Sequence, residues 1–251
     1  MKVKNILVSQ PQPENGKSPY LDIAEKHNVK VVFRPFIKVD PILSKEFRDQ
    51  KVNIAEHTAI VFTSRVGIDH FFRLAKDLRV NISDDLRYFC ISEAVALYLQ
   101  KYINYRKRKV FFGTTNLLSE LFTVISKHPK EKFLFILPDN DNSDVLELIA
   151  KNEKLSCSVG LMYRTVSNDF EPDEPFDYDM LLFFSPQGIA ALQKNFPNYE
   201  QGETVIGCLG AATAQAATEA GLRVDIPVPS PKYSSLSVAV DDFIKENHKR
   251  R

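Results

Sequence analysis

Residues 59–75 read AIVFTSRVGIDHFFRLA, and this stretch decides the class of fold. It begins with a continuous apolar run from Ala59 to Phe62, reaches hydroxyl side chains at Thr63 and Ser64, and continues with apolar residues at helical spacing. Continuous apolar runs are typical of parallel strands that are covered on both faces. The stretch therefore predicts a buried strand, a turn and an amphipathic helix.

Comparable apolar runs recur along the chain, and amphipathic segments separate them. This alternation predicts an α/β protein with doubly wound parallel sheets. We expect strands within residues 5–9, 31–37, 59–64, 88–92, 109–113, 133–137, 158–163, 180–185, 204–210 and 224–228. We expect helices within residues 66–75, 143–150, 211–220 and 234–247.

Two breaks in the alternation predict the domain organisation. Asp40-Pro41 follows the second apolar run, and residues 167–179, SNDFEPDEPFDYD, combine acids with two prolines and have the composition of a linker. These breaks predict one domain, residues 40–166, inserted into another made of residues 1–39 and 167–251. A head-to-tail pair of domains is the alternative that the pattern leaves open.

A weak internal repeat supports two domains of similar build. Residues 61–67, VFTSRVG, resemble residues 183–188, FFSPQG, and residues 90–97, CISEAVAL, resemble residues 208–215, CLGAATAQ. The two pieces occur in the same order in each half of the chain.

Composition narrows the class of protein. The 251 residues hold 33 Lys and Arg against 32 Asp and Glu, a net charge of +1, which argues against a nucleic-acid coat or a polybasic membrane binder. Cys90, Cys157 and Cys208 form no CxxC pair, so we expect buried thiols in a reducing compartment. No apolar window is long enough to cross a bilayer, and we expect a cytoplasmic protein.

The candidate binding residues lie where strands end and helices begin, because parallel sheets bind ligands there and helix N-termini attract anions. Their hydroxyl and backbone N–H groups suit carboxylates or phosphates; helix capping is the plainer explanation for the same residues. No P-loop, dinucleotide fingerprint or GxSxG motif is present, and the five histidines lack metal-ligand spacing, so we expect them on the surface or in loops. The candidates are Thr63, Ser64, Arg65, Ser185, Gln187, Gly188, Gly210 and Thr213.

With these motifs in their order, the chain resembles the uroporphyrinogen-III synthase family over nearly its whole length. The matching pieces are residues 6–11 (ILVSQP), 61–64 (VFTS), 161–165 (LMYRT), 183–188 (FFSPQG) and 208–214 (CLGAATA).

The resemblance implies two flavodoxin-like α/β domains joined by a two-strand connector, with the active site in the cleft between them. It implies a lyase of haem biosynthesis that cyclises the linear tetrapyrrole hydroxymethylbilane to uroporphyrinogen III, inverting ring D and releasing water. It implies no cofactor and no metal, and a small-molecule partner rather than a nucleic acid or a membrane. We expect a monomer.

The resemblance also implies roles for residues. Tyr163 matches the tyrosine that assists departure of the substrate hydroxyl, and the strand-end candidates match substrate contacts. Gln10 stands where many family members have Arg, and Arg65, Arg164 and Lys232 are the bases expected to compensate. Two alternatives stay open: a non-enzymatic anion-binding module, and a relative that kept the fold and lost the activity.

Overall fold

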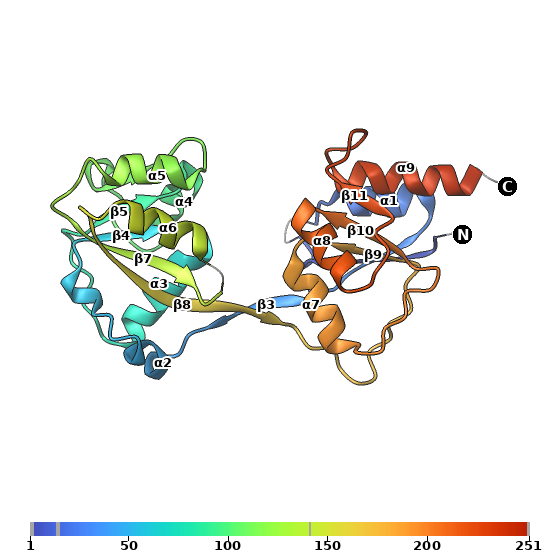
Figure 1. Cartoon of the computed structure of the whole chain (residues 1–251), viewed down its shortest axis with the longest axis horizontal. Helices are drawn as coiled ribbons and strands as arrows, with labels where there is room; N and C mark the ends of the chain where they lie inside the picture. The colour runs from blue at the N-terminus through green and yellow to red at the C-terminus, as the bar shows by residue number, and fades with distance from the viewer. Residues whose placement is uncertain (1–2, 14–15, 141, 250–251) are drawn as a thin grey trace. The chain divides into compact units, whose positions relative to one another are not determined.

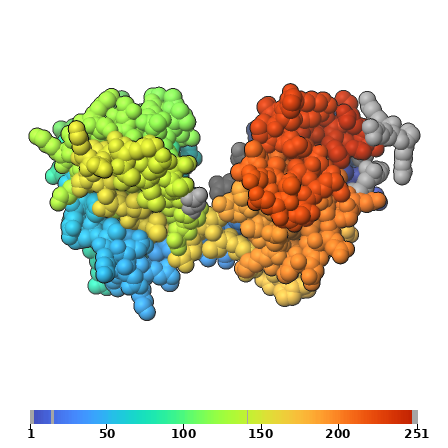
Figure 2. Space-filling model, in the orientation of Figure 1, coloured from blue at the N-terminus to red at the C-terminus, as the bar shows by residue number. Residues whose placement is uncertain are grey.

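The structure, a computed structural model of the chain, describes residues 3–13, 16–140 and 142–249. The chain divides into two compact units. Unit 1 comprises residues 1–38 and 166–251, and unit 2 comprises residues 39–165. Figure 2 follows this division in colour, because the orange and red of the C-terminal part gather in one body and the cyan to yellow of the middle part in the other.

Unit 1 contains a five-stranded sheet in the order β11-β10-β9-β1-β2, and all its paired strands are parallel. Alternate residues of β1 face opposite cores: Ile6 and Val8 pack with α1 and α9, while Leu7 packs with α7 and α8. Helices therefore cover both faces of the sheet (Figure 1), as the sequence predicts. The strands are β1 (Asn5–Val8), β2 (Lys30–Phe33), β9 (Met180–Phe183), β10 (Val205–Leu209) and β11 (Ile226–Val228); the helices are α1 (Pro19–His27), α7 (Pro186–Asn195), α8 (Ala211–Glu219) and α9 (Leu236–Lys249).

Unit 2 contains a six-stranded sheet in the order β3-β8-β7-β4-β5-β6. Every residue of β4 is fully buried, because helices pack against both faces of this central strand, as the continuous apolar run predicts. The strands are β3 (Ile37–Pro41), β4 (Ala59–Phe62), β5 (Arg87–Cys90), β6 (Val110–Phe112), β7 (Lys132–Pro138) and β8 (Ser156–Ser167). The helices are α2 (Ser44–Asp49), α3 (Arg65–Asp77), α4 (Glu93–Tyr98), α5 (Leu118–Ile125) and α6 (Ser143–Lys151), with 3₁₀ turns η1 (Ile54–Glu56), η2 (Leu99–Lys101) and η3 (Lys107–Lys109).

The chain passes between the units in β3 and β8, which are neighbours in the sheet (Figure 1). The predicted strand over residues 31–37 is in fact two strands, β2 and β3. Pro35 separates them, since it has no N–H group to donate to a sheet ladder.

Residues 167–179 have the composition of a linker, but most of this segment packs on unit 1, the unit to which the predicted boundary assigns it. Phe170 and Phe176 enter the aromatic cluster of unit 1, and the Arg34 guanidinium lies 4.0 Å from the centre of the Phe170 ring. Arg34 also pairs with Glu174 at 2.7 Å. The acidic composition resembles a linker, but the aromatic residues between the acids provide the packing surface.

The internal repeat of the sequence has a direct structural counterpart. In unit 2, β4 pairs with β5 so that Phe62 is opposite Cys90; in unit 1, β9 pairs with β10 so that Phe183 is opposite Cys208. The same strand pair, in the same register, thus occurs in both units.

Candidate functional site

Each sheet has one point at which the order of its strands reverses, and ligands of open parallel sheets bind outside the carboxyl ends of strands at such a point. In unit 2 the reversal lies between β4 and β7, and in unit 1 between β9 and β1. The residues that follow β4 and β9 include most of the candidates from the sequence. Topology therefore gives each unit a potential binding edge at the carboxyl ends of its central strands.

At the edge of unit 2, Ser64 follows Thr63 and caps α3. Its backbone is extended, and its Oγ accepts a hydrogen bond of 3.0 Å from the N–H of Gly67. Thr63 is half-buried, and Arg65, the first residue of the helix, is exposed. The cap satisfies one of the free N–H groups of the first turn and leaves others available to an anion.

Tyr163 reaches this cap from β8. Its hydroxyl lies 3.0 Å from Ser64 Oγ, and its side chain is buried. The register of β7 and β8 shifts by one residue between Leu137 and Pro138, immediately before Tyr163 is reached. Such a bulge re-aims the side chains that follow it, a local change that the sequence pattern does not reveal.

His70 of α3 stacks on Tyr163, with ring centroids 5.2 Å apart and the planes inclined by 20°. Its Nδ1 is buried and has no hydrogen-bond partner in the described part of the chain. The prediction that all the histidines lie on the surface or in loops is therefore wrong for His70. It is also wrong for His27, which belongs to α1 and pairs with Asp241 of α9 at 2.6 Å.

Burial governs the protonation of the ring pair. It raises the pKa of Tyr163 above the usual value near 10, although the hydrogen bond with Ser64 acts in the opposite direction. Burial also lowers the pKa of His70. Near neutral pH the phenol therefore keeps its proton and the imidazole is uncharged, so this edge contains a neutral proton donor that packing and a hydrogen bond hold in place.

At the edge of unit 1, Ser185 caps α7 as Ser64 caps α3. Its Oγ accepts a hydrogen bond of 3.3 Å from the N–H of Gly188. A Cβ atom at Gly188 would lie 3.3 Å from the Phe183 ring and 3.9 Å from Ser9 Oγ, so glycine lets the helix start close to the ends of β9 and β1. Gln187 is exposed on the first turn of α7.

Gly210 and Thr213 begin the next helix of this edge, α8. Gly210 has φ +92°, which side chains with a Cβ rarely adopt, and its N–H donates to the Val228 carbonyl at 2.5 Å. Thr213 is only 2% exposed, and its Oγ1 lies 3.7 Å from the position that a Gly210 Cβ would take. Ser9, Ser185 and Thr213 thus follow three adjacent strands, β1, β9 and β10.

The three expected bases differ in their contacts. Arg164 pairs with Glu46 at 3.0 Å and with Asp139 at 3.3 Å. Lys232 lies 3.4 Å from Glu246 and 3.8 Å from Asp242. Within residues 3–13, 16–140 and 142–249, Arg65 forms no ion pair; its guanidinium lies 5.6 Å from the centre of the Tyr98 ring. Of the three, Arg65 has the most freely available charge.

Two kinds of feature are missing from the described residues. No three His, Cys, Asp or Glu side chains among them gather closely enough to hold a metal ion. Nor do they include a helix that is long and apolar enough to cross a membrane.

The fold is that of a two-domain α/β protein, with two doubly wound parallel sheets joined by two strands. Hydroxyl groups and helix N-termini lie where the central strands of each sheet end, and such groups are suited to an anionic small molecule. The model of the family HEM4, described as uroporphyrinogen-III synthase HemD, matches residues 18–237. The chain therefore belongs to the uroporphyrinogen-III synthase family, whose members are lyases of tetrapyrrole biosynthesis.

Solved structures show the same fold. A uroporphyrinogen-III synthetase from Helicobacter pylori has a TM-score of 0.62 at 14% sequence identity, and the match covers 97% of this chain and 99% of that one. A mutant uroporphyrinogen III synthase from the extremely thermophilic bacterium Thermus thermophilus has a TM-score of 0.54 at 15% identity, covering 98% and 100% of the two chains. No curated protein matches the chain.

Proposed function

We propose that the chain cyclises hydroxymethylbilane to uroporphyrinogen III with inversion of ring D, and that Tyr163 is its proton donor. The family match over residues 18–237 is the observation on which the proposed reaction rests. The hydrogen bond of 3.0 Å between Tyr163 and Ser64 at a strand-end edge supports the role of the tyrosine.

The proposed chemistry begins with loss of the terminal hydroxyl of the substrate. The phenol of Tyr163 donates a proton to this hydroxyl, which leaves as water, and the lone pair of the pyrrole nitrogen forms the azafulvene. Attack by the substituted carbon of ring D forms a spirocyclic intermediate. Reopening of this intermediate with ring D inverted, then ring closure and proton loss, gives uroporphyrinogen III. A buried phenol is a weak acid, so its contribution is at the lower end of general-acid catalysis.

Positioning is the larger task of the proposed site. Hydroxymethylbilane closes unaided to the wrong isomer, so the protein must hold the conformation that brings the inverted ring into reach. The substrate carries eight carboxylates, and free N–H groups at helix starts together with hydroxyl groups donate hydrogen bonds to carboxylates. We assign substrate contacts to Thr63, Ser64, Arg65, Ser185, Gln187, Gly188, Gly210 and Thr213.

The proposal extends to partner and location. The nearly balanced charge favours a small polyanion over nucleic acid, and three free cysteines fit a reducing compartment. We propose a monomeric protein of the cytoplasm that needs no cofactor.

Freshly generated hydroxymethylbilane tests the reaction. The products are oxidised and the type I and type III isomers separated, with a reaction lacking the protein as control. We expect the type III isomer to dominate when the protein is present. Type I alone, formed at the rate of the control, would overturn the enzyme and favour the anion-binding module or the inactive relative.

A further inference from the structure

Unit 2 contains a cavity of about 240 Å³ that none of the proposed catalytic or substrate-contact residues lines. It lies where β5 and β6 begin, next to Leu86, Tyr88 and Val110. Ser64 follows the end of β4, a strand parallel to β5. All strands of a parallel sheet start on the same side of the sheet and end on the opposite side. The cavity lies where the strands start, and the proposed site lies where they end.

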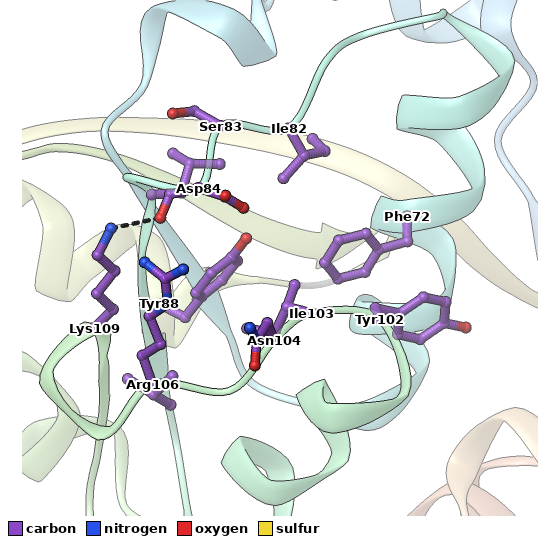
Figure 3. Close-up of a pocket in the computed structure, with 12 residues that line it drawn as sticks. Phe72, Ile82, Ser83, Asp84, Tyr88, Tyr102, Ile103, Asn104, Arg106 and Lys109 are labelled. Atoms are coloured by element: carbon purple, nitrogen blue, oxygen red, sulfur yellow. Dashed lines mark hydrogen bonds between the residues drawn. The ribbon is translucent and has the colours of Figure 1, made fainter.

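A tyrosine hydroxyl lines this cavity. Tyr88 is 4% exposed, and Figure 3 shows its hydroxyl directed toward the space between Phe72, Ile82 and Ile103. No residue of the described ranges forms a hydrogen bond with this hydroxyl. Burial, and then the charge of Asp84, raises the pKa of Tyr88 to about 12, so the phenol keeps its proton. A tyrosine hydroxyl that lines a cavity and has no protein partner is free to donate a hydrogen bond to a ligand there.

The charged lining consists of two bases and one acid. Arg106 and Lys109 face one carboxylate, Asp84. Lys109 is already held, since its ammonium donates to the Asp84 carbonyl and pairs with Asp85 at 2.8 Å. The charge of Arg106 helps to lower the pKa of Asp85 through a longer-range electrostatic interaction. Arg106 forms no ion pair within the described residues. The basic run at residues 101–109 thus brings an available guanidinium to the rim of the cavity.

The rest of the lining combines the polar residues Ser83 and Asn104 with an aromatic and aliphatic wall. Phe72 and Tyr102 stack with ring centroids 4.5 Å apart and planes inclined by 4°, and Ile82 and Ile103 complete the wall. The Tyr102 hydroxyl bonds to Asp69. This bond and the stacking fix the orientation of the aromatic pair.

We propose that this cavity binds a small carboxylate carried on a single ring. The carboxylate accepts the hydrogen bond of Tyr88 and pairs with Arg106, and the ring lies against Phe72 and the two isoleucines. The volume is below the roughly 300–1,000 Å³ of sites for drug-sized ligands, which restricts the ligand to about one ring.

Benzoate is the probe, and its binding to the full chain is followed by calorimetry and by the shift in melting temperature. We expect saturable binding, with benzamide, the neutral analogue of the same shape, at least tenfold weaker. Arg106→Gln and Tyr88→Phe should each weaken benzoate at least fivefold. Arg108→Gln is the matched control, because Arg108 is exposed in the same basic run and does not line the cavity; its effect should stay below twofold.

Three results would overturn the site: no saturable binding, equal binding of benzamide, or equal losses in Arg106→Gln and Arg108→Gln, which would indicate diffuse attraction by the basic run. The synthase assay separates this proposal from the catalytic one. Arg106→Gln and Tyr88→Phe should keep the wild-type rate of uroporphyrinogen III formation, since neither residue belongs to the proposed catalytic edge.

Discussion

The two units share an architecture and differ in what their strand ends present. Ser64 and Ser185 cap equivalent helices with almost the same backbone angles, φ −154° and ψ 159° against φ −156° and ψ 154°, and each accepts from a glycine three residues on. In unit 2, however, Ser64 also contacts a buried tyrosine. The edge of unit 1 presents small hydroxyls and glycine backbone.

From this difference we infer that the two units have the same architecture but different tasks in the proposed reaction. A phenol held by a serine hydroxyl and a stacked imidazole is suited to moving a proton. Small hydroxyls beside helix N-termini are suited to holding carboxylates. Substitutions at the two edges should therefore have different effects on kcat and KM.

Tyr163→Phe tests the task that we assign to unit 2. Loss of the phenolic proton should lower kcat by about 100-fold, the lower end of the range for a general acid, with little change in KM. Tyr88→Phe, which removes a hydroxyl at the opposite ends of the strands of the same sheet, should keep the wild-type kcat. Full kcat in Tyr163→Phe would remove the proposed proton donor.

Gly210→Ala tests whether the backbone at the start of α8 in unit 1 requires a glycine. A Cβ at φ +92° should lower the free energy of unfolding by about 1–3 kcal/mol. The matched variant is Gly67→Ala in unit 2, where a Cβ would make ordinary contacts of 3.4 Å and 3.6 Å inside a helix, so stability should hold or rise slightly. Urea unfolding measures both, and equal losses would contradict the assigned role of the glycine backbone in unit 1.

Ser64→Ala and Ser185→Ala form a matched pair of cap removals. Each should cost about 1 kcal/mol of stability, as cap losses do. Ser64→Ala should also lower kcat, because Tyr163 loses its hydrogen-bond partner, whereas Ser185→Ala should mainly raise KM. Steady-state kinetics distinguishes the two patterns, and the same pattern in both variants would argue against a division of tasks.

Glu120→Gln gives the smallest effect and concerns pH. Hydrogen bonds from Thr115 and Thr114 lower the pKa of Glu120 from 4.5 to about 2 in the folded chain. The charged carboxylate therefore stabilises the fold above pH 4.5, and this contribution disappears as the pH falls toward 2. The urea midpoint of the variant should be below that of the wild type at pH 7, and the difference should vanish near pH 2.

Glu174→Gln is the counterpart in unit 1, where the hydrogen bond of Arg34 lowers the pKa of the carboxyl. Its effect should have the same sign and should also be lost on acidification. A midpoint difference that grows toward low pH in either variant would contradict the linkage.

The sequence predicted the fold class, and structure and family comparison confirm it. Periodicity was sufficient because buried parallel strands and amphipathic helices must repeat to cover both sheet faces. Periodicity failed at residues 31–37, where Pro35 divides one predicted strand into two. Composition alone did not show that Phe170 and Phe176 pack the linker-like acidic segment onto unit 1.

At the candidate site, the sequence indicated the strand-end hydroxyls and, through resemblance, Tyr163. It did not indicate His70, because a single histidine on an amphipathic helix has no pattern that points to a stacked ring. A signal for the cavity of unit 2 was present as the basic run, but its aromatic wall comes from residues separated along the chain.

Local spacing and composition were enough to give the alternation of strands and helices, the near-neutral charge and the repeated strand–serine–glycine motif. Only the tertiary structure decided which side chains meet. Ser64 and Tyr163 are 99 residues apart, and a one-residue register shift between β7 and β8 lies directly before the tyrosine that reaches the cap. Contacts of this kind depend on how neighbouring strands are aligned, which no local pattern encodes.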